Sequence, residues 1–309
     1  MGGSGGGLLG NIDPEEYIKK VRIAEQRSTS SEFNTEVNRI INDVLLSAND
    51  RPIDDIKRHL EVIIDALSKD IDNSIELLYA GSVAKHTYVN GLSDIDSLAI
   101  INNTELKNKS PKEVLDYFYF KLKERLPNTE VKVGRLAVTI IYSNNIQIQI
   151  LPTLKTLTGI KIAKSNGEND WSTVIKPDKF AQKLKEVNSL NAQKVVPIIK
   201  LAKSIISDLP EKRQVSGYHA ESLAIEAFEN YQGLKTPKEM LKHFFIESSK
   251  RILEPIKDNT GQSVHVDDYL GERNSVSRQI ISDSFAQIVR KMQNADGSTQ
   301  IELWKSLLK

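Results

Sequence analysis

The hydrophobic periodicity of this chain changes twice, and this change constrains the fold more than any other feature of the sequence. Apolar residues first recur at helical spacing, over residues 31–48 and 53–69. Short apolar runs follow between residues 75 and 151, which is typical of strands. From about residue 177 the spacing is again helical. The pattern predicts an α+β fold, in which a lobe with a sheet precedes an all-helical lobe and the active site lies in the cleft between them.

The same pattern sets the expected boundaries. Residues 1–10 are mostly Gly and predict a flexible, added linker. Residues 11–175 are assigned to the lobe with the sheet and the N-terminal helices, and residues 176–309 to the helical lobe. We expect strands over residues 75–80, 97–101, 131–133, 136–142 and 146–151. We expect helices over residues 14–27, 31–48, 53–69, 112–125, 178–188, 191–208, 217–230, 236–253, 277–294 and 300–308, with a kink at Pro197.

Composition narrows the classes of function. The 309 residues carry a formal net charge of +1, so no overall basic field favours stable binding of nucleic acid. The sequence contains no cysteine, which excludes disulfides, zinc–thiolate sites and cysteine nucleophiles. No apolar run reaches the ~18 residues of a membrane span, and the N-terminus lacks the pattern of a signal peptide. We therefore expect a cytoplasmic protein with no membrane partner.

The segment from Gly81 to Asp96 carries the chemistry. It reads GSVAKHTYVNGLSDID, follows one expected strand and leads into the next. Gly81 lets the backbone approach a ligand closely, and Ser82 adds a hydroxyl donor, so the start of the segment can hold phosphate groups. Asp94 and Asp96 are two residues apart, and on a strand such residues share one face.

Two carboxylates on one face can converge on divalent cations. Mg²⁺ suits them because it prefers oxygen ligands and bridges carboxylates to phosphates, and Mn²⁺ is an alternative. A pair of such ions can activate an attacking hydroxyl and stabilise a leaving pyrophosphate. An isolated Asp-x-Asp is more often an acidic turn, but the Gly-Ser pair upstream, between two strands, favours a metal site at Asp94 and Asp96.

These residues resemble the signature of nucleotidyltransferases of the polymerase-β superfamily, in which Gly-Ser and a short spacer precede Asp-x-Asp. His86 departs from it, since a small residue is typical there. The resemblance implies a polymerase-β-like lobe with a mixed sheet. It also implies that Gly81, Ser82 and Lys85 contact the nucleotide and that Asp94 and Asp96 are catalytic metal ligands.

The same family normally places a third Asp or Glu on a later strand, shortly before a Pro. The matching strand here precedes Pro152, and its polar face carries Gln147 and Gln149. An amide offers a neutral oxygen but neither charge nor useful basicity. We assign Gln149 to the third catalytic position, with Gln147 as the alternative. Three explanations remain open: an inactivated site, a Gln that coordinates adequately, or an acid from elsewhere in the chain.

Two segments of the helical part also resemble the superfamily. In IIKLAKSI, residues 198–205, Lys203 and Lys200 one turn earlier match a helix that supplies a lysine to the triphosphate. The other interpretation is two solvated lysines on a helix surface.

The second segment is SGYHAESL, which begins at Ser216. Ser216 suits an N-cap, and the resemblance adds a hydroxyl contact to phosphate. Tyr218 either stacks on a base or fills core space. His219 is interpreted as a packed or surface residue and Glu221 as a structural one.

The order of motifs and the length resemble most the oligonucleotide cyclases of bacterial anti-phage systems, the cGAS/DncV-like nucleotidyltransferases (CD-NTases) of CBASS. This implies ATP, GTP or other nucleoside triphosphates as substrates and a cyclic oligonucleotide messenger as product, and it leaves room for a regulatory protein partner. One alternative is a nucleotidyltransferase that acts on RNA or protein. The other is a nucleotide-binding module without turnover, which Gln147 and Gln149 favour.

Overall fold

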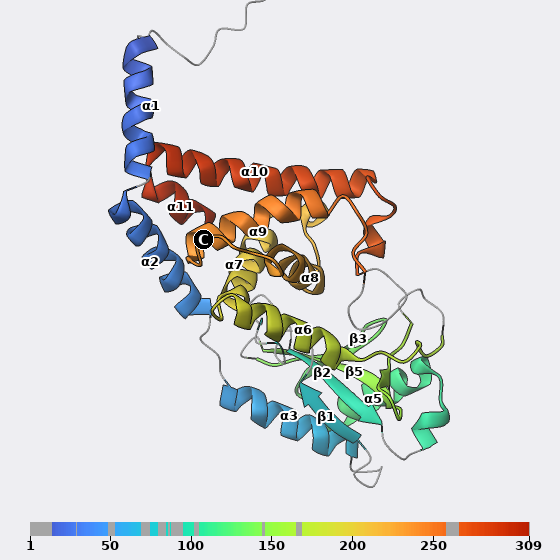
Figure 1. Ribbon diagram of the computed structural model, residues 1–309. Coiled ribbons are helices and arrows are strands. Elements are labelled where there is room, and N and C mark those ends of the chain that lie inside the picture. The colour runs from blue at the N-terminus through green and yellow to red at the C-terminus, as the bar shows by residue number, and fades with distance from the viewer. Residues whose placement is uncertain are drawn as a thin grey trace, which may run out of the picture.

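The computed structural model consists of two lobes built from different elements (Figure 1). A sheet with its covering helices forms one lobe, and helices alone form the other. The structure describes residues 14–28, 30–48, 53–68, 75–79, 85, 87, 95–101, 105–143, 146–164, 169–257 and 266–308. Within these ranges, no helix is long and apolar enough to cross a membrane.

The sheet is mixed. Its strands run in the order β1-β2-β5-β4-β3, and β6 pairs with β5 beyond this path. β2 and β5 are parallel, and the other pairs are antiparallel. The α+β class predicted from the change of period is confirmed, as is the mixed sheet that the family resemblance implied. The strands are β1 (Ile75–Tyr79), β2 (Ile95–Ile101), β3 (Glu130–Val133), β4 (Val138–Ile141), β5 (Gln147–Lys155) and β6 (Ile160–Lys161).

One face of the sheet is covered by α3 (Ile53–Ser68) and α5 (Pro111–Arg125), with the short η1 (Glu105–Asn108) before α5. Ile148 and Ile150 of β5 are fully buried in this core. The alternation of β5 explains the layer, because every second side chain of a strand points to the same face.

The helical lobe forms a separate core, in which buried apolar side chains from all its long helices meet. Figure 1 shows α6 between the sheet and the remaining helices of this lobe. Its helices are α6 (Pro177–Leu190), α7 (Val195–Ser207), α8 (Gly217–Phe228), α9 (Pro237–Arg251), α10 (Val276–Ser298) and α11 (Ile301–Leu307), with the short η2 (Glu211–Arg213) and η3 (Asp268–Leu270).

The N-terminal helices α1 (Pro14–Ser28) and α2 (Ser31–Ala48) pack differently from the division drawn on the sequence. Val37 and Ile41 of α2 are fully buried in the core of the helical lobe, not in that of the sheet lobe. In Figure 1, α1 stands at the corner of the helical lobe near α10 and α11. The apolar stripe of α2 predicted a buried face, but a stripe does not identify the helices that cover it.

The kink expected at Pro197 is absent because the helix starts later than expected. α7 begins at Val195, after a turn in which Ala192 and Gln193 have positive φ angles of 55° and 62°. Pro197 therefore lies in the first helical turn. Backbone N–H groups there have no partner within the helix, so a proline removes no helical hydrogen bond.

Candidate active site

The parallel pair β2–β5 brings two sequence-predicted positions side by side. The Cα atoms of Asp96 and Gln149 are partners in the register of these strands. On its other side Gln149 is paired with Thr139 of β4, whereas Gln147 is paired with Ile141. Gln149 is half-buried and Gln147 is exposed. Position 149 is thus the neighbour of Asp96 in the middle of the sheet.

Side chains from two distant segments converge on the carboxylate of Glu221. Lys203 of α7 donates to Oε1 of Glu221 at 2.7 Å, and the hydroxyl of Thr87 donates to the same oxygen. Lys85 forms an ion pair with Oε2. Lys203 also donates to the backbone carbonyl of Thr87 at 3.2 Å. Since Lys85 and Thr87 lie between β1 and β2 in the sequence, this Glu221 cluster joins the sheet lobe to α7 and α8.

The Glu221 cluster is buried and brings two ammonium groups to one carboxylate. The side chain of Glu221 is 1% exposed, that of Lys203 6% and that of Lys85 11%. Burial raises the pKa of Glu221, but the attraction of Lys85 and Lys203 outweighs it and holds the pKa below its usual value. The Glu221 carboxylate therefore holds two ammonium groups close together, and closely spaced cations are suited to an anionic ligand.

Lys85 also contacts the faces of two aromatic rings. Its Nζ lies 4.8 Å from the ring centroid of Phe180 and 5.0 Å from that of Tyr218. The two rings pack against each other at 4.6 Å between centroids. A cation over ring faces is stabilised by their electrons. Tyr218 thus supports Lys85 and packs at the edge of the helical core.

The N-terminus of α8 lies directly beside Lys203. Ser216 is the N-cap, and its Oγ accepts a hydrogen bond from the backbone N–H of His219 at 3.2 Å. A Cβ added to Gly217 would lie 3.4 Å from Nζ of Lys203, so the ammonium group is close to the first turn of α8. A helix N-terminus carries partial positive charge, and a lysine beside it is unfavourable unless negative charge is near. Glu221 supplies part of that charge, and a phosphate group is what such a terminus commonly binds.

Apart from Gln147 and Gln149 of β5, the sequence-predicted site residues divide into three groups. Lys203, Lys85, Ser216 and Tyr218 lie around the Glu221 cluster. Lys200 is buried on α7, one turn before Lys203. Gly81, Ser82 and Asp94 lie outside the described residues, as does the side chain of Asp96.

Glu221 was interpreted from the sequence as a structural residue, and the structure adds that its carboxylate holds Lys85 and Lys203 together. A signal for it existed in the sequence. Lys203 lies within an apolar helix stripe, and a lysine that is buried on folding needs a carboxylate partner. Glu221 is the acidic residue in the segment that the family resemblance had already connected with Lys203.

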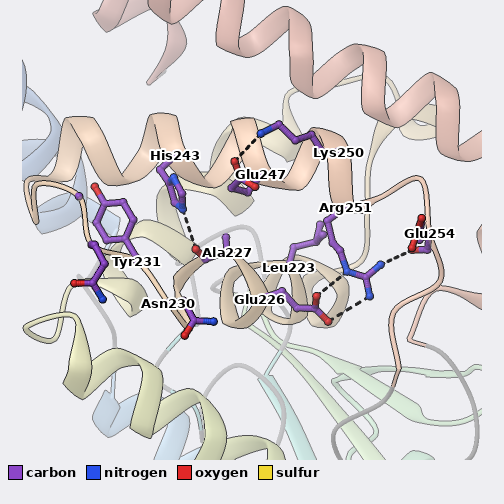
Figure 2. Close-up of a pocket in the computed structure, with 12 residues that line it drawn as sticks. Leu223, Glu226, Ala227, Asn230, Tyr231, His243, Glu247, Lys250, Arg251 and Glu254 are labelled. Carbon is purple, nitrogen blue, oxygen red and sulfur yellow. Dashed lines mark hydrogen bonds and ion pairs between the residues drawn. The ribbon is translucent and has the colours of Figure 1, made fainter.

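A separate hollow of about 690 Å³ lies within the helical lobe, between the end of α8 and α9 (Figure 2). Its charged groups pair with one another: Arg251 donates to Glu226 at 2.6 Å, and Lys250 pairs with Glu247 at 2.8 Å. The ring of Tyr231 forms part of its lining. The residues that line it include none of the site residues predicted from the sequence, so we do not assign the nucleotide to this hollow.

Comparison with known families defines the class. The fold, with a mixed sheet facing a helical lobe across a cluster of lysines, is that of a nucleotidyltransferase. The family model described as "Second Messenger Oligonucleotide or Dinucleotide Synthetase domain" (SMODS) matches residues 27–188, just over half of the chain. The chain therefore belongs to the SMODS family of bacterial CD-NTases, the family that its motifs resembled. No curated protein matches the sequence significantly.

Solved structures support the fold. Escherichia coli MS115-1 CdnC with ATP has a TM-score of 0.65 at 17% identity, over 88% of this chain and 96% of that one. The same protein in a HORMA-deltaN complex has a TM-score of 0.65 at 18% identity, over 90% and 98%. Bradyrhizobium diazoefficiens CdnG with GTP has 0.64 at 13%, over 88% and 97%. The polymerase core of TRAMP, an RNA surveillance complex, has 0.62 at 15%, over 91% and 96%. Because a CD-NTase and the polymerase core of an RNA surveillance complex share this fold, the fold alone does not define the reaction.

Proposed function

We propose that this protein joins nucleoside triphosphates into a cyclic oligonucleotide messenger at a metal-dependent site between β2, β5 and the Glu221 cluster. One observation carries the proposal: Lys85, Thr87 and Lys203 converge on Glu221. This contact unites the segment that contains the Gly-Ser…Asp-x-Asp motif with the two helices that carry the remaining motifs. It also places the ammonium groups of Lys85 and Lys203 where a triphosphate is expected.

The residues of the chain act by positioning and by neutralising charge. Lys203, Lys85 and Ser216 bind the triphosphate of the donor nucleotide. A ribose hydroxyl of a second nucleotide attacks the α-phosphorus, so that a new P–O bond forms, the bond to the β-phosphate breaks, and pyrophosphate leaves. The proton of the attacking hydroxyl passes to a base or to water. A second transfer of the same kind closes the ring.

The donor set at β2–β5 fits Mg²⁺. The carboxylates of Asp94 and Asp96 and the amide oxygen of Gln149 are all oxygen donors, which Mg²⁺ prefers, and Asp96 and Gln149 are register partners. A divalent ion held there would polarise the phosphate and lower the pKa of the attacking hydroxyl.

Gln149 makes this form of the enzyme slow. An amide at the third position supplies neither the charge that holds a cation nor a basic oxygen that can take a proton. The pairing of position 149 with Asp96, and the exposed position of Gln147 at the start of β5, support Gln149 as the third position. This explanation accounts for the missing carboxylate without an acid from another strand.

The relatives suggest a biological setting. E. coli MS115-1 CdnC has been solved in complex with HORMA-deltaN, and a regulatory protein partner is part of the proposal for this chain. We further propose a cytoplasmic role in anti-phage signalling. A transferase that acts on RNA is the second candidate, because the polymerase core of TRAMP shares the fold.

Product analysis tests the proposal. The protein is incubated with all four nucleoside triphosphates and Mg²⁺, treated with phosphatase, and its products are identified by mass spectrometry. A phosphatase-resistant cyclic product is expected, and Asp94→Asn combined with Asp96→Asn should abolish it without changing the melting temperature by more than a few degrees. Unchanged product from the double variant would exclude the metal site. Nucleotide binding by calorimetry without pyrophosphate release would favour a binding module, and extension of added RNA would favour the second candidate.

A further inference from the structure

Two serines cap helices in this protein in different ways. Ser110 caps α5 with a complete capping box, in which its Oγ accepts from the N–H of Glu113 at 3.4 Å and its own N–H donates to the Glu113 carboxylate at 2.9 Å. The Ser110 hydroxyl also donates to this carboxylate, at 2.7 Å. The N-terminus of α5 is therefore occupied by negative charge.

The cap of α8 replaces the carboxylate with a neutral relay. The third helical residue is His219, which offers no carboxylate to Ser216. Instead, the N–H of Ser216 donates to the phenol oxygen of Tyr269 at 3.2 Å, and this oxygen lies 2.9 Å from Nδ1 of His219. Burial raises the pKa of Tyr269, and the N–H and hydroxyl of Ser216 both oppose the shift as hydrogen-bond donors. Ser216 is thus held through a residue 53 positions later in the chain.

The direction of the hydrogen bonds follows from the chemistry of the groups. Burial lowers the pKa of His219 to about 4, so its ring is neutral. The Tyr269 oxygen accepts from Ser216 and donates its own hydrogen to Nδ1 of His219. The remaining ring hydrogen is then on Nε2, which faces Oδ2 of Asp267 at 3.7 Å. Tyr269 as a whole residue is 56% exposed. Its phenol oxygen is nevertheless held by Ser216 and His219, which distinguishes it from an ordinary surface side chain.

A buried ion pair fixes the segment that carries Tyr269. Arg278 of α10 is fully buried and donates to Oδ2 of Asp267 at 2.6 Å. It also donates to the backbone carbonyls of Ile252 and Gly271, both at 3.0 Å. Because Asp267 and Tyr269 are two residues apart, this pair holds the phenol oxygen in place beside α8.

The geometry points to Tyr269 as a positioning residue for nucleotide binding. It completes the cap of α8 with a neutral oxygen that holds both the N–H and the hydroxyl of Ser216, so Tyr269 brings no negative charge to the positive N-terminus of α8, where the triphosphate is expected. A carboxylate in the same place, as at Ser110, would bring that charge. The inference rests on the proposed function, since it requires Ser216 to contact phosphate. It gives the C-terminal segment, in which the sequence showed no chemistry, a direct role at the site.

Tyr269→Phe tests the inference because it removes only the phenol oxygen. The KM for the nucleoside triphosphate that gives product, from pyrophosphate release, and its Kd from calorimetry should both rise about three- to tenfold, the size of one neutral hydrogen bond. The value of kcat should change less than twofold. In a Ser216→Ala background, Tyr269→Phe should have no further effect, because the group that it positions is already missing.

Two matched controls separate binding from stability. Tyr231→Phe removes a phenol that donates to the Leu234 carbonyl at 2.8 Å beside the hollow of Figure 2, and it should leave KM unchanged. Ser110→Ala removes the cap of α5 and should lower the melting temperature without raising KM.

The outcomes distinguish the positioning role of Tyr269 from the phosphate contact of Ser216. If Ser216→Ala weakens nucleotide binding but Tyr269→Phe does not, or if the two losses multiply in the double variant, the positioning role of Tyr269 is overturned. If Ser216→Ala itself leaves Kd and KM unchanged, the phosphate contact of the proposed function fails instead.

Discussion

Two buried carboxylates, Glu221 of α8 and Asp267 just before η3, have opposite surroundings. Glu221 receives Lys85, Lys203 and the Thr87 hydroxyl, so that it links the two lobes. Asp267 receives the guanidinium of Arg278 and the backbone N–H of Ile256 at 3.0 Å, all within the helical lobe. Both are almost completely removed from water.

The difference lies in the number of cations around each carboxylate. At Asp267 one cation meets one carboxylate, and the remaining Arg278 donors are satisfied by backbone carbonyls. At Glu221 two ammonium groups share one carboxylate beside a helix N-terminus. A pair whose donors are all satisfied serves the fold, whereas two neighbouring ammonium groups at a helix N-terminus also attract an anionic ligand. Burial of an ion pair alone is therefore no indication of a binding site.

The largest effect on stability is expected at the ion pair between Asp267 and Arg278. Arg278→Met leaves Asp267 buried without its cation and should lower the free energy of unfolding by about 3–5 kcal/mol, measured by urea denaturation. Adding Asp267→Asn should recover part of the loss. Arg273→Met is the control, since Arg273 is 69% exposed in its pair with Glu254, and it should change stability by about 0.5 kcal/mol or less. A loss as small as that of the control would contradict the account of this pair.

The Glu221 cluster should respond to an anion. Glu221→Gln removes the carboxylate that Lys85 and Lys203 share and should lower the free energy of unfolding by about 2–3 kcal/mol in the absence of ligand. Inorganic tripolyphosphate should raise the melting temperature of this variant more than that of the unchanged protein, because the anion replaces the missing charge. For Arg278→Met no such extra increase is expected. Equal increases in all three proteins would show that the Glu221 cluster is not an anion site.

The relay beside Asp267 should give stability a dependence on pH. The folded protein holds the pKa of His219 at about 4, chiefly by burial, with Arg278 and Arg251 lowering it and Asp267 raising it. An unfolded chain binds this proton near pH 6.5, so the free energy of unfolding should fall as pH drops from 6.5 to 4, by about 3 kcal/mol in full. His219→Asn cannot titrate and should lack this component. Parallel stability–pH curves for the two proteins would refute the assignment.

The sequence predicted most of the elements because their signals are local. The alternation of Gln147 to Ile150 predicted a strand with one buried face, and Ile148 and Ile150 of β5 are buried as expected. The packing of α2 was not predictable in this way, since its apolar stripe fits either lobe. The kink predicted at Pro197 was wrong for a related reason. The effect of a proline depends on where the helix begins, and the start of α7 is set by the turn before it.

The predictable part of the site was the part carried by short motifs. Lys203 and Ser216 were singled out because their spacing matched a known pattern, and the structure brings them to one helix end. The role of Glu221 could have been inferred from the buried position of Lys203. Tyr269 had no comparable signal, because it reaches Ser216 through tertiary packing that Arg278 maintains.

The central claim is that β2 and β5 hold a nucleotidyl-transfer site with an amide in place of its third carboxylate. It is tested most directly by pyrophosphate release from nucleoside triphosphates with Mg²⁺, measured for the unchanged protein, Gln149→Asp and Gln147→Asp. Gln147 is the matched control, because it lies on the same strand but is paired with Ile141 and is exposed. The account predicts that Gln149→Asp raises the rate about 100-fold or more and that Gln147→Asp leaves it unchanged. Equal rates for all three proteins, or a gain only from Gln147→Asp, would contradict it.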